Sequence, residues 1–260
     1  MKGIKRLFAE LFLLMSAMML VWPMQLHAMP VGGQVVAGSA AITQPSANQM
    51  NVNQATDKAI INWQGFSTGT SETVQFIQPG SSSVALNRVT GVDPSVLLGQ
   101  LLANGRIFLL NPNGVVFGPG SRVDVAGLLA TTLNLTNEDF LAGRYLFTQD
   151  PNSPLASVVN KGIITTQNGG FVILAAPLVA NEGTILANLG DVQLGATTKA
   201  TVNFDGTGLV NFAISGLEGP AGTVLMTPQA ASDVLKSVVN SKGVVEAGSV
   251  VEENGVVKLV

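Results

Sequence analysis

Short phrases recur along the second half of this chain at a nearly constant spacing. Residues 159–165 read VNKGIIT, and residues 180–186 read ANEGTIL, 21 positions later. A second phrase, residues 168–174, returns at 188–194 with an offset of 20 positions. A period of about 20 residues, built from short β-branched runs and glycine turns, is typical of a solenoid in which each repeat stacks on its neighbours.

The repeat predicts an all-β chain. Its apolar positions alternate or run continuously, and glycines interrupt every stretch that would be long enough for a helix. This is not the pattern of an amphipathic helix. The fixed leucine and asparagine spacing of a leucine-rich repeat is absent, so we expect a parallel β-helix whose strands stack at about 4.8 Å. Residues 240–246, 60 positions beyond the second copy, and residues 254–259 look like later copies. Residues 29–260 would then form roughly eleven coils in a rod about 50 Å long, and the equal spacing argues against scattered surface hairpins.

The corners of the coil are expected at the Asn-Xaa-Gly sequences. Asn and Gly adopt left-handed backbone conformations at little steric cost, and stacked Asn side chains can hydrogen-bond along the rod. Two stretches interrupt the repeat: residues 136–147 are more charged and aromatic than their surroundings, and residues 149–154 form an irregular turn. We interpret both as an excursion from the coil that covers one of its faces.

The first residues have the layout of a secretory signal peptide. Three basic residues precede an apolar run over residues 11–22, and Ala28 and Met29 flank a plausible cleavage site. The apolar run is too short to span a bilayer as a helix, although an uncleaved membrane anchor is the alternative. Residues 1–28 are therefore predicted to be removed on the way to the periplasm.

Loss of this leader narrows the chemistry open to the rest of the chain. The sequence has no Cys, and its single His, His27, leaves with the leader. A Ser-His-Asp triad, a Cys-His pair and a His/Cys metal site are therefore excluded. Removal also takes three of 13 basic residues and one of 16 acidic residues, which leaves a net charge near −5 and argues against nucleic acid as a partner.

A β-helix can also carry a polysaccharide lyase or hydrolase, whose site gathers acidic and basic residues on adjacent coils. Here Asp93, Asp124, Asp191 and Asp205 are scattered without a shared spacing, and the dense oxygen cluster that Ca²⁺ needs is absent. Trp63 is interpreted as a core residue rather than a platform for sugars. We expect no enzyme activity, no metal and no cofactor, and keep a β-helical carbohydrate-active enzyme as the alternative function.

A concentrated turn signal lies between two apolar runs. Residues 107–110 and 115–117 have β-strand character, and Asn111-Pro112-Asn113-Gly114 joins them. Proline fixes φ, while Asn and Gly tolerate positive φ. The sequence predicts a rigid corner at this point, with two readings: the corner only shapes the coil, or it also contacts a partner.

This motif resembles the hallmark Asn-Pro-Asn-Gly sequence of the two-partner secretion domain, found at the N-terminus of filamentous-haemagglutinin-type exoproteins. Further blocks similar to that domain follow in order, and together they cover roughly residues 31–150: residues 35–42, 59–66, 84–91, 93–105, 137–140 and 143–145. The resemblance implies a right-handed parallel β-helix with small extra-helical strands or hairpins. It also implies a secreted exoprotein of the haemagglutinin or adhesin type.

The resemblance implies partners as well. The Sec translocon would deliver the chain to the periplasm of a Gram-negative bacterium, where POTRA domains of a TpsB-type outer-membrane β-barrel transporter would recognise the secretion domain. Asn111, Pro112, Asn113 and Gly114 would serve as contacts or as a structural turn. The chain would cross the outer membrane unfolded, wind up outside, and meet a host or neighbouring cell surface. Many members carry a further Asn-Pro-Asn-Leu or Asn-Ser-Asn-Leu motif, which residues 77–84 lack, so the transporter subclass stays open.

Three parts are expected along the chain. Residues 1–28 are the signal peptide, residues 29–155 the secretion domain with capping strands and first coils, and residues 156–260 continuing coils. The repeat is still running at Val260 without a polar cap, although a solenoid needs one for solubility. We therefore expect most of a longer passenger to be missing. A naturally short exoprotein whose last strands serve as the cap is the alternative.

Overall fold

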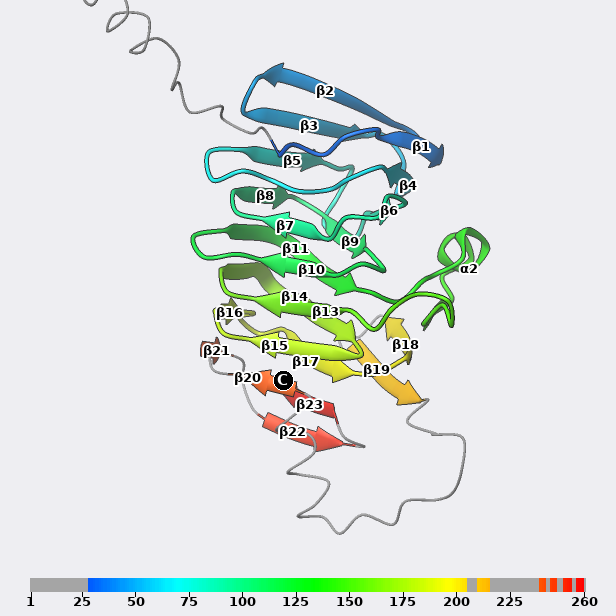
Figure 1. Ribbon diagram of the computed structural model, residues 1–260, viewed down its shortest axis with the longest axis vertical. Helices are drawn as coiled ribbons and strands as arrows, with labels where there is room; N and C mark the ends of the chain where they lie inside the picture. The colour runs from blue at the N-terminus through cyan, green and yellow to red at the C-terminus, as the bar shows by residue number, and fades with distance from the viewer. Residues whose placement is uncertain are drawn as a thin grey trace, which may run out of the picture.

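The computed structural model describes residues 28–204, 210–215, 239–241, 244–246, 250–253 and 256–259, and after residue 204 it describes the backbone only. The chain is a β-solenoid of about seven turns (Figure 1). Most strands pair in parallel with the equivalent strand of the next turn, which confirms the predicted all-β parallel β-helix. The leader over residues 1–27 lies outside the described residues.

A full turn visits three faces. The first face consists of β3 (Gln49–Gln54), β5 (Thr73–Ile77), β8 (Gln100–Ala103), the first halves of β11 (Arg122–Thr131) and β14 (Ile163–Ala176), β16 (Thr184–Leu186) and β21 (Val244–Glu246). The second face consists of β4 (Lys58–Trp63), β6 (Val84–Val89), β9 (Arg106–Leu110), the second halves of β11 and β14, and β17 (Asp191–Ala196). The third face consists of β7 (Ser95–Leu97), β10 (Val115–Phe117), β13 (Ser157–Asn160), β15 (Leu178–Asn181) and β20 (Val239–Ser241).

The number of turns is smaller than the eleven predicted, because most coils are longer than the repeat. On the first face, Gln49 pairs with Thr73, and Thr73 pairs in turn with Gln100. Both of these steps along the chain are longer than the repeat seen in residues 159–186. Thr184 pairs directly with Val244, so the third copy of the first phrase lies one turn further, not three. Between these two positions, the described strands over residues 199–204 and 210–215 belong to a separate sheet outside the three faces.

Antiparallel strands lie at both ends of the described solenoid. β1 (Gln34–Ala37) runs antiparallel to β4, and β2 (Ala40–Ser46) antiparallel to β3. At the other end, β22 (Val250–Glu253) and β23 (Val256–Leu259) form an antiparallel pair, and β23 is also antiparallel to β17. The prediction that residues 254–259 repeat an earlier coil strand is therefore wrong for 256–259, and residues 254–255 lie outside the described residues.

Inward-facing apolar side chains, most of them aliphatic, fill the interior of the coil from all three faces. Where Asn residues of adjacent turns stack, their polar side chains point into this interior and form hydrogen bonds there. Asn160 and Asn181 are register neighbours on β13 and β15, both are fully buried, and Asn160 Nδ2 donates to Asn181 Oδ1 at 2.8 Å. This confirms the expected stacking of Asn side chains along the rod.

The outer side of the second face is buried as well. One side chain from each of five adjacent strands forms a ladder in register, and each is at most 1% exposed: Ile60, Leu86, Phe108, Leu129 and Ile173. A short helix, α2 (Asn137–Ala142), and the antiparallel strands β12 (Tyr145–Thr148), β18 (Lys199–Phe204) and β19 (Val210–Ser215) lie beside this face (Figure 1). The predicted excursion over residues 136–147 is thus part of an outer layer formed by α2, β12, β18 and β19.

Candidate functional site

The Asn-Pro-Asn-Gly corner joins β9 on the second face to β10 on the third face. The two strands end and begin where the sequence predicted, at Leu110 and Val115. Gly114 N donates to Asn111 O at 3.1 Å, which closes a tight turn. Asn113 N donates to Asn111 Oδ1 at 2.9 Å, so the first Asn side chain organises the backbone of its own turn.

Asn111 is fully buried and links three successive turns of the coil. Its Nδ2 donates to Asp93 O and to Ser95 Oγ, each at 3.0 Å, and both acceptors lie at the corner of the preceding turn. Its backbone N donates to Thr131 O, at the end of the strand in the following turn, at 3.0 Å. A buried amide with all these partners fixes the spacing and register of the three corners.

Asn113 and Gly114 extend these contacts in both directions. Asn113 Nδ2 donates to Gly91 O of the preceding corner at 2.9 Å. Gly114 has φ +117°, and a Cβ built on it would lie 3.3 Å from Ser157 O. Asn111 and Asn113 do not use the positive φ that Asn tolerates, because Leu189 is the one non-glycine residue with positive φ in the described part of the chain. Asn is required here for its amide group, which donates and accepts at once.

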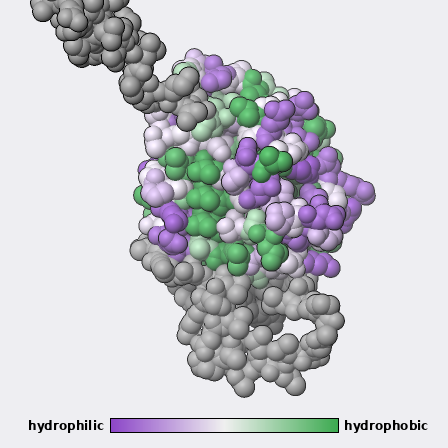
Figure 2. Space-filling model, in the orientation of Figure 1, coloured by the Kyte–Doolittle hydropathy of each residue, from purple (hydrophilic) through white to green (hydrophobic). Residues whose placement is uncertain are grey.

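An apolar strip lies beside this corner on the outside of the third face. Val96, Val116, Val159 and Ala180 point outward on four adjacent strands and lie in register, and we call them the valine ladder. Figure 2 shows apolar side chains gathered in a column over this side of the molecule. Contiguous exposed apolar surface is typical of contact surfaces and offers no group for proton transfer.

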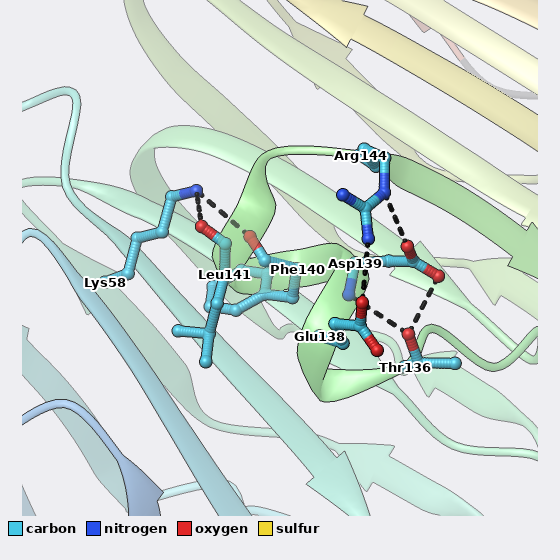
Figure 3. Close-up of polar contacts among 7 residues, drawn as sticks. All are labelled: Lys58, Thr136, Glu138, Asp139, Phe140, Leu141 and Arg144. Atoms are coloured by element: carbon cyan, nitrogen blue, oxygen red, sulfur yellow. Dashed lines mark hydrogen bonds and ion pairs between the residues drawn. The ribbon is translucent and has the colours of Figure 1, made fainter.

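Helix α2 of the outer layer has a side-chain cap at its N-terminus (Figure 3). Thr136 Oγ1 accepts from Asp139 N at 3.1 Å and donates to Asp139 Oδ2 at 2.8 Å. Arg144 Nε donates to Asp139 Oδ1 at 2.8 Å. The hydrogen bond from Thr136 and then that from Arg144 hold the pKa of Asp139 below its usual value.

Two cationic side chains from earlier turns hold the same helix against the coil. Lys58 Nζ, on β4, donates to the carbonyl oxygens of Phe140 and Leu141, each at 3.0 Å (Figure 3), and partial burial lowers the pKa of Lys58. Arg88, on β6, donates to Asn137 Oδ1 at 2.7 Å and to the carbonyl oxygen of Leu135. The excursion is therefore bound to strands that lie 49 and 82 positions earlier in the chain.

The described carboxylates considered as catalytic lie in or next to different strands, on different faces of the coil: Asp93, Asp124 and Asp191. Asp124 forms an exposed ion pair with Arg122 at 3.0 Å, Asp93 contributes its backbone carbonyl to the corner, and Asp205 lies outside the described residues. Within the described ranges, no three His, Cys, Asp or Glu residues gather in a way that could hold a metal ion, and no helix has the length and apolar character of a membrane span. Trp63 is 1% exposed in the core, as interpreted.

The predicted cleavage site lies where the described chain begins. Ala28 is half-buried, Met29 belongs to the inner core, and Ala28 N donates to Glu72 Oε1 at 3.1 Å. The sequence pattern of the leader predicted the cleavage site between Ala28 and Met29. It did not indicate that the side chain of Glu72 contacts this site. The only sequence signal for Glu72 is a lone acidic residue before an apolar strand, and such residues are usually exposed.

Comparison with known proteins gives a family and several relatives. A family model described as the TPS secretion domain matches residues 27–260. A heme/hemopexin-binding protein of Haemophilus influenzae is 35% identical over 229 residues, which cover 85% of this chain and 23% of that protein. A second protein of that name and organism is 41% identical over 120 residues, covering 46% of this chain and 13% of that protein. The chain thus spans less than a quarter of the length of these relatives.

The solved structures that are similar to this chain include two secretion domains. The HMW1 secretion domain from Haemophilus influenzae superimposes with a TM-score of 0.65 at 36% identity, covering 72% of this chain and 49% of that one. The filamentous hemagglutinin secretion domain gives a TM-score of 0.54 at 17% identity, covering 84% of this chain and 75% of that one. At 17% identity the second likeness concerns the fold alone.

Proposed function

This chain belongs to the TPS secretion domain family, as its sequence blocks predicted, and from that premise we propose that it directs the export of a secreted exoprotein of the haemagglutinin or adhesin type. The family match over residues 27–260 carries this proposal. The leader takes the chain through the Sec translocon, and POTRA domains of a TpsB-type transporter then recognise the secretion domain in the periplasm. The product is released from, or held at, the surface of a Gram-negative cell, where it meets a host or neighbouring cell.

The proposal also gives a separate role to each of two parts of the chain. Residues 29–155 carry the blocks read by the transporter, and residues 156–260 continue the coils. Pairing of β10 with β13 and of β11 with β14 carries the sheets across position 155 without a break. The second part therefore extends the fold that the first part begins.

The Asn-Pro-Asn-Gly corner supports export chiefly by its shape. The five residues that form hydrogen bonds with the buried Asn111 side chain and backbone favour this reading for that residue. Pro112 and Asn113 are half-buried, so their outward atoms are the part of the motif that a transporter could touch. Asn111 is thus proposed to shape the coil, whereas Pro112 and Asn113 are proposed to contact the transporter.

A secretion assay separates the two roles. The chain is produced with its transporter, and its amounts outside the cell and in the periplasm are measured together with the melting temperature of the purified variant. Asn111→Ala should lose both stability and export, whereas Asn152→Ala, in an exposed turn, should keep both. Loss of export by Pro112→Ala at unchanged melting temperature would assign direct contact to Pro112. Normal export of Asn111→Ala would contradict the proposal.

The proposed function is not enzymatic and uses no cofactor. The family supports secretion and binding rather than turnover. The scattered carboxylates of the described coils give the carbohydrate-active alternative no support. Incubation of the purified protein with acidic polysaccharides should give no new reducing ends or unsaturated sugars, and turnover abolished by a single Asp substitution would revive that alternative.

A further inference from the structure

Glu72 is a buried carboxylate that meets the beginning of the described chain. Its side chain is on the loop before β5, and the residue is 2% exposed. Oε2 accepts a hydrogen bond from Gly69 N at 2.7 Å, and Oε1 accepts one from Ala28 N at 3.1 Å. The second bond joins residues 44 positions apart and brings the predicted leader junction to a fixed place in the fold.

The residues after this junction are built into the solenoid. Met29 is 7% exposed and packs in the inner core, and Pro30 is buried. Val31 N donates to Gly65 O at 2.9 Å, and Gln64 N donates to Val31 O at 2.9 Å. A peptidase needs an accessible, extended segment, so the bond between Ala28 and Met29 can be cut only before this segment docks.

Leader removal changes one of the donors that face Glu72, the backbone nitrogen of Ala28. Hydrolysis of the bond between Ala28 and Met29 by a leader peptidase consumes one water, leaves a carboxylate on Ala28, and leaves an amine on Met29. An α-amino group has a pKa of about 7.7–8.0 in peptides, so it is mostly a cation at neutral pH. The Ala28 N–H donor is lost, and a charged group with three donors appears on the next nitrogen along the chain.

A buried carboxylate has a strong physical preference for this second donor. Burying a charge is costly unless it is paired and hydrogen-bonded. Hydrogen bonds between an ammonium and a carboxylate are about twice as strong as neutral ones. Capture of a terminal amine at a defined site is also a known mode of recognition.

We propose that Glu72 is the receptor for the N-terminus created by leader removal. The ammonium of Met29 binds the Glu72 carboxylate, and this ion pair fastens residues 29–31 to the core. Chains that keep the leader lack this ion pair. The inference rests on the leader removal proposed above and adds a site within the chain that completes the first turns only after processing.

The test compares chains that differ only at the N-terminus. N-terminal sequencing of the exported protein first establishes the start. The chain from Met29 is then released from a fusion with its native amine, and a second version carries Gly-Ser before Met29. The extension should lower the melting temperature by about 3 °C or more in the wild type and by less than about 1 °C in Glu72→Gln. Glu182→Gln, an exposed member of a surface ion pair, should keep the full effect.

Amine reactivity gives a readout that needs no substitution at Glu72. A docked amine should react with an amine-directed reagent at least about ten-fold more slowly than the extended one, because the ion pair withholds its free base. Equal rates, or an extension effect of the same size in wild type and Glu72→Gln, would overturn the Glu72 proposal and leave the export function standing. Sequencing that finds another start would overturn both the cut at Met29 and this inference.

Discussion

At the scale of single residues, the corner depends on an amide that acts as donor and acceptor at once. Asn111 Nδ2 donates to two oxygens of the preceding turn, while Oδ1 accepts from the backbone and side-chain nitrogens of Asn113. A carboxylate of the same size could accept but not donate. A hydroxyl would be too short to meet partners on both sides.

Replacing Asn111 with Asp should therefore destabilise the protein although size and shape are kept. The new oxygen would face the carbonyl of Asp93, so the substitution should lower the free energy of unfolding by about 2–3 kcal/mol. Urea denaturation followed by circular dichroism measures this. Asn152→Asp, in an exposed turn, should change it by less than about 0.5 kcal/mol. Equal effects of the two substitutions would refute the role assigned to Asn111.

Acidification should destabilise helix α2, because it protonates the carboxylate of Asp139. Its folded pKa lies below the ordinary value of 3.8, first because of Thr136 and then because of Arg144. A lowered pKa means that the stabilisation is fully present above pH 3.8 and is lost as the pH falls through the folded pKa. The protection factor of the Gly143 amide, measured as the intrinsic exchange rate divided by the observed rate at the same pH, should therefore fall on acidification in the wild type. In Asp139→Asn this part of the pH dependence should vanish, and an unchanged acid profile would contradict it.

The position of the corner was predictable from the sequence, but the physical reason for its residues was not. Turn statistics for Asn combine two effects, tolerance of positive φ and side-chain hydrogen bonding. Which effect operates at Asn111 depends on partners such as Asp93 and Thr131, which belong to neighbouring turns. A local pattern holds no information about those partners, so the position was predictable and the mechanism was not.

At the scale of elements, the strands of the third face expose one row of side chains and bury the next. In β13, Val158 is buried in the inner core, and its neighbour Val159 belongs to the outward valine ladder. The sequence predicted the strand from its β-branched residues. The sequence does not indicate which of the two valines points inward. Both are apolar, so the strand shows no alternation of polar and apolar residues at this point.

This pair offers a matched test of the inside and outside of the coil. Val158→Ala should lower the free energy of unfolding by about 2 kcal/mol, because it removes two buried methyl groups and leaves a cavity. Val159→Ala, the same change one residue further, should cost less than about 1 kcal/mol. Chemical denaturation of both variants measures the difference. A larger loss for Val159→Ala would show that the two sides are assigned the wrong way round.

At the scale of the whole molecule, both insertions of the outer layer leave the coil at equivalent corners. The Asn-Pro-Asn-Gly corner joins the second face to the third with four residues, whereas the same corner of the next turn contains residues 132–156. Two turns later, β18 and β19 follow β17 at this corner. The outer layer is thus assembled from insertions in two different turns that meet as β12 and β18.

Phe140 should be the most sensitive single position of the outer layer. It is fully buried, packs edge-on against Phe108 with ring centroids 6.1 Å apart, and lies under Lys58. Phe140→Ala should lower the free energy of unfolding by about 3–5 kcal/mol and speed amide exchange in β4 and β6. Leu141→Ala, next to it and half-exposed, should cost less than about 1 kcal/mol. Unchanged exchange in β4 and β6 would argue against the coupling of this layer to the first turns.

The fold class was predictable from the repeat, whereas the number of turns was not. The repeat of 21 positions holds from Asn160 to Asn181, which stack directly, and extending it to the whole chain gave too many coils. Earlier turns contain longer loops, and the step from Thr184 to Val244 contains the inserted strands β18 and β19. A solenoid tolerates such insertions at its corners because they leave the stacked strands unchanged, so the period alone cannot fix the count.

The pairing of β12 with β18 also sets an order of events in time. Tyr145 pairs with Val202, which is made much later in the chain, and both lie over strands that precede them. For an export that began at the N-terminus, Ile60 and Leu86 would emerge long before the residues that shield them from water. Until those residues followed, the first turns would be wound with their outer apolar side bare. A pause before residue 202 would then be the moment when emerging molecules are most prone to aggregate.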